Sequence, residues 1–183
     1  AIGNNMLLQE IYGRGQTWHL TQFWVDQQFL DKRLQLKVGR LTVGEDFASF
    51  SCDFQNLSFC GSQPGNLVSD YWINWPTSQW AVRLKYNMSP QSYAQIGAYQ
   101  VNPTYIDDDY ARRSGWKLDN PAGTTGALIP LEFGWSPAPG GLPGSYKVGG
   151  WYNSSNGADL YTDVDGRPRG TTGAQPLQHD GQY

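Results

Sequence analysis

Hydrophobic and polar residues alternate most clearly in the segment WAVRLKYN, residues 80–87. Its even positions carry Trp, Val, Leu and Tyr, and its odd positions carry Ala, Arg, Lys and Asn. Because successive side chains on a β-strand point to opposite faces, this segment has one apolar face and one polar, cationic face. The alternation predicts a strand, but it does not decide whether the apolar face packs a protein core or meets the hydrocarbon of a bilayer.

Six strand-like segments are predicted, and the gaps between them alternate between short and long. Antiparallel strands joined in this way place every short turn at one end of a sheet and every long loop at the other. That arrangement is typical of an outer-membrane β-barrel, whereas soluble sandwiches rarely sort their loops so strictly. The strands are expected at about 17–29, 34–43, 79–88, 93–102, 127–136 and 145–153, the short turns at 30–33, 89–92 and 137–144, and the long loops at 44–78, 103–126 and 154–177.

Strand length and the placement of aromatic residues also favour a barrel wall. Most segments are near the ~9–11 residues that a tilted strand needs to cross a bilayer, and they exceed the ~5–6 residues of a common strand. Trp80 and Tyr86 lie at opposite ends of one apolar face, and Tyr146 and Tyr152 repeat that arrangement. Such rings favour the two membrane interfaces. We therefore predict an all-β fold, part of an antiparallel up-and-down transmembrane barrel.

Two residues interrupt the alternation. Pro130 falls inside the fifth segment, where it cannot donate to a ladder, so it predicts a bulge or the end of one pairing. Arg40 falls on the apolar parity of the second segment. Either a bulge intervenes there, or Arg40 already lies beyond the membrane.

The composition agrees with a wall that is wet on one side and apolar on the other. Charged residues make up 16% of the 183 residues, against about a quarter in soluble domains. The net charge of -3 gives no reason to expect nucleic acid as a partner. The chain begins without Met and ends on HDGQY, where another strand would begin. It is therefore interpreted as an internal fragment that forms a single partial barrel domain.

Two cysteines, Cys52 and Cys60, lie in the long loop 44–78. A disulfide between them would stabilise the loop by roughly 2–3 kcal/mol and would indicate an oxidising compartment. The alternative is a pair of buried, reduced thiols. No metal site is expected, because His19 and His179 are remote from both cysteines in the sequence.

An ordered set of motifs runs through most of the chain. These are VGRLTVGEDFASFSCDFQNLSFCG, PGNLVSDYWINWP, SQWAVRLK, YQVNP, TTGALIPLEFGW and GGLPGSYKVGGWY. Over about residues 8–153 the set resembles the OprB-type carbohydrate-selective porins of Gram-negative bacteria. The resemblance implies an outer-membrane barrel of about sixteen strands that passes glucose and other small sugars by diffusion and has no cofactor. Residues 110–116 and the segment after Ser154 fit the family poorly, so no function is carried over to them.

A sugar-selective pore needs side chains that hydrogen-bond hydroxyl groups and rings that stack on the C–H faces of the sugar. Residues on the polar parity of the clear strands are the first candidates for lining it, namely Arg83, Lys85, Glu132 and Lys147. Glu45 and Asp46 follow the second strand and lead into an aromatic loop containing Phe47, Phe50 and Phe54. That loop either folds inward and narrows the pore or packs as a small core.

Three further residues complete the candidate site. Trp72 and Trp75 are the best candidates for stacking on a sugar, although both could instead belong to the outer aromatic girdle. Arg40 resembles the arginine of the family's GR motif, which implies a role in the lumen or in anchoring a loop.

Alternative functions remain open at this stage. A soluble carbohydrate-binding sandwich would explain the aromatic residues but not the sorted loops. A glycoside hydrolase would need two opposed carboxylates, and adjacent Glu45 and Asp46 on an extended chain point apart, so no enzyme is predicted. A general porin fits the gap pattern equally well. The expected partners are small sugars and outer-membrane lipid, and a homo-oligomer is left open.

Overall fold

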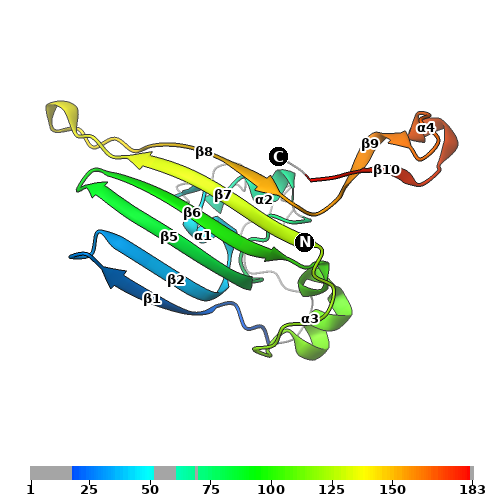
Figure 1. Ribbon diagram of the computed structural model, residues 1–183, viewed down its shortest axis with the longest axis horizontal. Helices are drawn as coiled ribbons and strands as arrows, with labels where there is room; N and C mark the ends of the chain where they lie inside the picture. Colours follow the sequence, from blue (N-terminus) through cyan, green and yellow to red (C-terminus); the bar gives the residue numbers. More distant parts are fainter. Residues whose placement is uncertain (1–17, 52–60, 69, 182–183) are drawn as a thin grey trace, which may run out of the picture.

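The computed structural model describes residues 18–51, 61–68 and 70–181, and its main element is a six-stranded antiparallel sheet (Figure 1). The strands follow the chain in the order β1-β2-β5-β6-β7-β8, so each hydrogen-bonds to its sequence neighbour in an up-and-down meander. β1 and β8 form the two edges, and the sheet is open between them. The strands are β1 (Phe23–Phe29), β2 (Leu34–Leu41), β5 (Gln79–Ser89), β6 (Ser92–Val101), β7 (Gly126–Trp135) and β8 (Tyr146–Asn153).

The six strands lie where the alternation of the sequence predicts them. The largest difference is at β1, which begins at Phe23 rather than near residue 17. The first segment, around Trp18–Phe29, is apolar at both parities, so its pattern could not mark the first paired residue. The short turns join the strands at one end of the sheet, and the long loops gather at the other, as Figure 1 shows.

The register is continuous at both positions where the sequence suggested a break. Arg40 pairs directly with Trp80 inside an unbroken β2–β5 ladder, so no bulge displaces it from the apolar parity. At Pro130 the β6–β7 pairing is interrupted and resumes in the same register, while the β7–β8 pairing stays continuous. The missing N–H of proline removes a local ladder bond without shifting the strand.

In this sheet the apolar face is exposed and the polar face is buried, which is the reverse of the arrangement in a soluble protein. We define the outer face by Val38, Val82, Leu84, Ile96 and Leu131, and the inner face by Lys37, Arg83, Gln95 and Glu132. On β7, Leu131 of the outer face is 58% exposed, whereas its neighbour Glu132 of the inner face is 3% exposed. A contiguous apolar face of this size in water would be a strong liability, so the outer face is built to contact an apolar medium.

Short elements fill the long connections at one end of the sheet. The first connection carries α1 (Val43–Asp46), β3 (Ser49–Phe50), β4 (Gly61–Ser62) and α2 (Pro64–Leu67), and the second carries η2 (Pro103–Ile106) and α3 (Asp108–Ser114). η3 (Pro139–Gly141) lies in the short β7–β8 turn. Within the described ranges, no helix has the length and apolar character to cross a membrane.

The third connection is not the simple loop that the sequence predicted for 154–177. It contains β9 (Gly157–Asp163), α4 (Arg169–Thr172) and β10 (Pro176–His179), and β9 pairs with β10 as a separate two-stranded sheet. The carboxylate of Asp163 accepts hydrogen bonds from the backbone N–H groups of Asp165 and Arg167. These bonds close a tight turn after β9, which sends the chain back alongside it instead of along β8.

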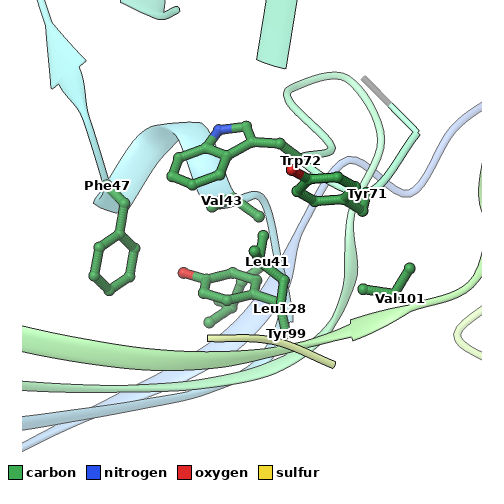
Figure 2. Close-up of a cluster of buried hydrophobic side chains, with 8 residues drawn as sticks. All are labelled: Leu41, Val43, Phe47, Tyr71, Trp72, Tyr99, Val101 and Leu128. Carbon is green, nitrogen blue, oxygen red and sulfur yellow. The ribbon is translucent and has the colours of Figure 1, made fainter. Parts of the chain in front are cut away.

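A small hydrophobic core lies on the inner face at the long-loop end. It joins residues of the first long connection to residues of β2, β6 and β7 (Figure 2). The aromatic loop therefore folds onto the inner face and packs there as a compact unit. The buried residues of this core are Leu41, Val43, Phe47, Tyr71, Trp72, Tyr99, Val101 and Leu128.

Replacing Leu131 with Arg tests which medium meets the outer face. An arginine at the bilayer midplane costs about 2–4 kcal/mol, and Leu131 lies mid-strand in β7 among other exposed apolar residues. We expect Leu131→Arg to lower the free energy of unfolding in lipid vesicles by about that amount. The matched control is Leu160→Arg, because Leu160 is 92% exposed on β9 outside the main sheet. Equal stability of the two variants would show that hydrocarbon does not contact Leu131.

Candidate functional site

The carboxylate of Asp46 fastens the first long loop to the inner face. Lys37 Nζ lies 3.1 Å from Asp46 Oδ2, and Arg83 Nη1 lies 3.8 Å from Asp46 Oδ1. Arg83 also reaches Asp26 on β1, with 3.2 Å between Nη2 and Oδ2. The side chains of Lys37, Arg83 and Asp46 are each less than a tenth exposed. Because a buried charge is costly without its partner, these four residues hold α1 in one position.

Glu132 holds the next part of the same loop. Its Oε2 accepts a hydrogen bond from the backbone N–H of Ala48 at 2.6 Å. Its Oε1 accepts from the Tyr93 hydroxyl at 2.7 Å and from Gln95 Nε2 at 3.0 Å. Gln95 Nε2 also donates to the backbone oxygen of Asp46. Both oxygens of the Glu132 carboxylate are thus engaged, one by the loop and the other by side chains of β6.

Gly97 makes room for the aromatic contact beneath α1. The rings of Phe47 and Tyr99 meet edge to face, with centroids 6.0 Å apart. A Cβ atom at position 97 would lie 2.6 Å from Tyr99 Cε2 and 3.0 Å from Phe47 Cε2. Only glycine allows both rings to lie this close to the strand. The loop is therefore fixed by apolar packing as well as by charge.

Two lysines lie beside this network on the inner parity. Lys85 Nζ lies 4.0 Å from the centroid of the Tyr93 ring, a cation–π contact. Within the ranges that the structure describes, no carboxylate pairs with Lys85. Lys147 Nζ donates to the backbone oxygen of Ser49, although its residue on β8 remains exposed. These are the least neutralised cations of the inner face.

The structure separates the two tryptophans that the sequence proposed for stacking. Trp72 is 2% exposed; its Nε1 donates to Ser62 Oγ at 3.1 Å, and its ring packs edge-on against Trp151 with centroids 5.2 Å apart. It is a core residue, so both the stacking role and the girdle role predicted for Trp72 are wrong. Trp75 is 40% exposed and keeps an accessible ring. Glu45 is also exposed, on α1.

Arg40 lies on the outer face, away from the other candidate residues. Its Nη2 donates to the backbone oxygen of Ser78 at 2.8 Å, and its Cζ lies 4.4 Å from the centroid of the Tyr105 ring. The neighbouring Trp80 donates from Nε1 to the backbone oxygen of Asp119 at 2.9 Å. Arg40 therefore anchors a loop, and the lumen-lining alternative for it is wrong.

We call residues 103–124, which lie over Arg40, the outer flap. Gln100 Nε2 donates to Asn120 Oδ1 at 2.8 Å and holds its far end. Tyr110 donates its hydroxyl to Asp119 Oδ1. Burial raises the pKa of the Tyr110 hydroxyl well above its ordinary value, and the bond to Asp119 raises it further. The protonated Tyr110 hydroxyl thus joins α3 to Asp119 near the other end of the flap.

Several residues of the network were not among the sequence candidates. Lys37 shares the polar parity of β2 and could have been found from its alternation. Asp26 lies in the segment whose two parities are both apolar, so its face was not readable. Gln95 carried no signal, because a neutral amide is common on any polar face. Cys52, Cys60 and Phe54 lie outside the described residues, so the predicted disulfide stays a prediction.

Comparison with known proteins gives one consistent result. The chain matches the family model of the carbohydrate-selective porins, OprB family, over residues 1–183. It is 50% identical over 173 residues to Porin B from Pseudomonas aeruginosa, covering 93% of this chain and 37% of that protein. It also resembles the high-pH structure of OprB from Pseudomonas putida, with a TM-score of 0.86, 48% identity, and coverage of 95% of this chain and 40% of the other. The chain spans less than half the length of these relatives.

Gly97→Ala tests whether the Phe47–Tyr99 contact fixes the loop. The added methyl group cannot fit between the two rings and the strand, so we expect a loss of about 1–3 kcal/mol in stability. We also expect faster proteolytic cleavage within residues 42–78. Gly150→Ala is the control, since no heavy atom lies within 4 Å of a Cβ built there. Indistinguishable cleavage rates would remove this contact as the anchor.

The outer flap is expected to respond to alkaline pH through Tyr110. The pKa of Tyr110 is raised in the folded chain, so its stabilising effect is complete below the unfolded value of about 10. That effect is lost as the pH rises through the higher folded pKa. An ultraviolet titration of the protein minus that of Tyr110→Phe should show one phenol ionising later than the ordinary tyrosines. Ionisation of that phenol near its ordinary value would contradict the buried bond to Asp119.

Proposed function

The chain belongs to the OprB family of carbohydrate-selective porins, and from this premise we propose that the whole protein lets small, glucose-like sugars diffuse passively across the outer membrane. The described strands form part of the barrel wall, with the outer face against lipid and the inner face against the pore. The protein provides a path for diffusion and catalyses no reaction. It needs no cofactor to do so.

The observation that carries this proposal is the first long loop, held on the inner face. A loop that lies inside a barrel narrows the pore, and a narrow pore selects solutes when its walls keep a fixed shape. Asp46, Glu132 and the Phe47–Tyr99 contact fix the loop at three points. We assign Arg83, Asp46 and Glu132 to positioning this loop, because their polar atoms are largely engaged within the protein.

The groups left for contact with a sugar lie on this fixed loop and on the strands β5 and β8. Glu45 and Lys147 are exposed, and Lys85 is partly exposed beside the Tyr93 ring. They offer charges of both signs, which suits a neutral solute rich in hydroxyl groups better than it suits an ion. Trp75 offers an accessible ring for stacking on the C–H face of a sugar. The proposed contacts are therefore Glu45, Trp75, Lys85 and Lys147.

Conductance across planar lipid membranes tests the proposal. We expect glucose to block the ionic current of the full-length protein more strongly than an amino acid of similar size. In Lys85→Gln the block by glucose should weaken about tenfold, because a hydrogen bond from a charged group is lost. Lys32→Gln is the control, since Lys32 is an exposed residue of the β1–β2 turn, at the end of the sheet away from the first long loop (Figure 1).

The outcomes separate the selective pore from a general one. Equal or absent block by the two solutes, with ionic conductance retained, would leave a non-selective porin. A protein that needs no detergent and carries no current would instead favour a soluble carbohydrate-binding module. Block that is selective but unchanged in Lys85→Gln would remove Lys85 from the proposed contacts.

A further inference from the structure

The outer flap occupies an unusual place for a polar loop, because it lies over the outer face. Arg40, Trp80 and Gln100 are the last outer-face residues at the long-loop ends of β2, β5 and β6, and each contacts a flap residue. Val38, two residues before Arg40 on β2, is 45% exposed, and Val82, two residues after Trp80 on β5, is 38% exposed. The flap therefore begins where the exposed apolar wall ends. In Figure 1, α3 projects beside this end of the sheet.

The flap carries large apolar side chains that the described chain leaves about half exposed. Trp116 is 59% exposed and Leu118 is 48% exposed, directly after α3. The backbone N–H of Leu20 donates to the oxygen of Gly115 at 2.9 Å, so the segment before β1 lies against the end of α3. That segment carries Trp18, which is 85% exposed.

Apart from Asp119, which accepts a hydrogen bond from the Tyr110 hydroxyl, the charges of the flap are sorted along the chain. The other acidic residues are at the start of α3, where Asp107 caps the helix by accepting from the N–H of Tyr110 at 2.8 Å. Its cations are at the other end, where Arg112 and Arg113 occupy the last turn and Lys117 follows beside the Trp116 ring. Asp109 pairs with Arg113 at 3.5 Å with both side chains more than 70% exposed, and such surface pairs are weak.

We propose that the outer flap is a docking surface for the phosphate groups of lipid headgroups in the outer leaflet. Long loops of outer-membrane barrels lie on the external side, so the flap lies at the level of those headgroups. Tryptophan and leucine beside arginine and lysine are the residues that bind membrane interfaces, the rings at headgroup depth and the cations on phosphates. The proposed surface consists of Trp18, Arg112, Arg113, Trp116, Lys117 and Leu118.

Two features favour lipid over a second copy of the chain as the occupant. The surface is continuous with the apolar outer face, which already contacts lipid. The charged residue beside the Trp116 ring is the cation Lys117, which complements phosphate. The proposal is independent of what passes through the pore, because none of its residues lies on the inner face.

The test compares diphosphorylated lipid A with its dephosphorylated form, bound to the full-length protein in neutral detergent. We expect native mass spectrometry to show tighter binding of the phosphorylated form, and to show that this preference weakens as the ionic strength rises. Neutralising Arg112, Arg113 and Lys117 together to Gln should reduce binding of the phosphorylated form by about tenfold or more. Binding of the dephosphorylated form should not change.

The control keeps the number of removed charges while moving them off the flap. Lys32, Arg167 and Arg169 lie in the β1–β2 turn and in the third connection, and their joint replacement by Gln should leave lipid A binding unchanged. Equal binding of the two lipid forms by the unaltered protein would overturn the proposal without needing any variant. Self-association that Trp116→Ser abolishes, with no lipid preference, would overturn it in favour of a second copy.

Discussion

The exposed apolar face of the main sheet is the constraint on which the other features depend. All six strands present Val, Leu, Ile or Phe outward, and the charged residues of β5 and β7 lie between them on the inner face. A sheet with this pattern is stable only where hydrocarbon meets the apolar side, since water there would expose a large continuous patch. The charged side must then be hydrated, or it must be satisfied by other parts of the protein.

The first long loop meets that second requirement. It brings the Asp46 carboxylate to two cations that would otherwise face each other on adjacent strands, Lys37 and Arg83, which are directly paired in the register. It also supplies an N–H group to Glu132. The same contacts that satisfy the inner face therefore fix the shape of the loop, and in the proposed pore they fix the shape of the constriction. In the proposed pore, stability and selectivity therefore have one structural origin.

The outer flap shows the same logic on the opposite face. Arg40 would be costly on a wall that meets hydrocarbon, but it lies at the end of β2, where Tyr105 and the carbonyl of Ser78 enclose it. Arg40 holds the flap in place, and the flap in turn covers Arg40 with the Tyr105 ring. Two long loops that start at the same end of the sheet thus cover its two faces in different ways, one inside and one outside.

The sequence by itself determined the strands, their antiparallel order and the face to which most side chains belong. This was possible because period-two alternation is local, and because the lengths of the gaps sort the loops between the two ends. The resemblance of its motifs identified the family. The sequence also placed Arg83, Lys85, Glu132 and Lys147 on the correct face, since parity alone decides that.

Only the tertiary structure decided what those side chains contact. It showed that Glu132 accepts a hydrogen bond from a backbone N–H more than eighty positions away. It also showed that Trp72 is buried and that Arg40 holds a loop on the outer face. It also turned the third connection into a separate hairpin. Each of these depends on where a long loop packs against the sheet. Alternation carries no information about that position, because contacts between residues distant in the chain determine it.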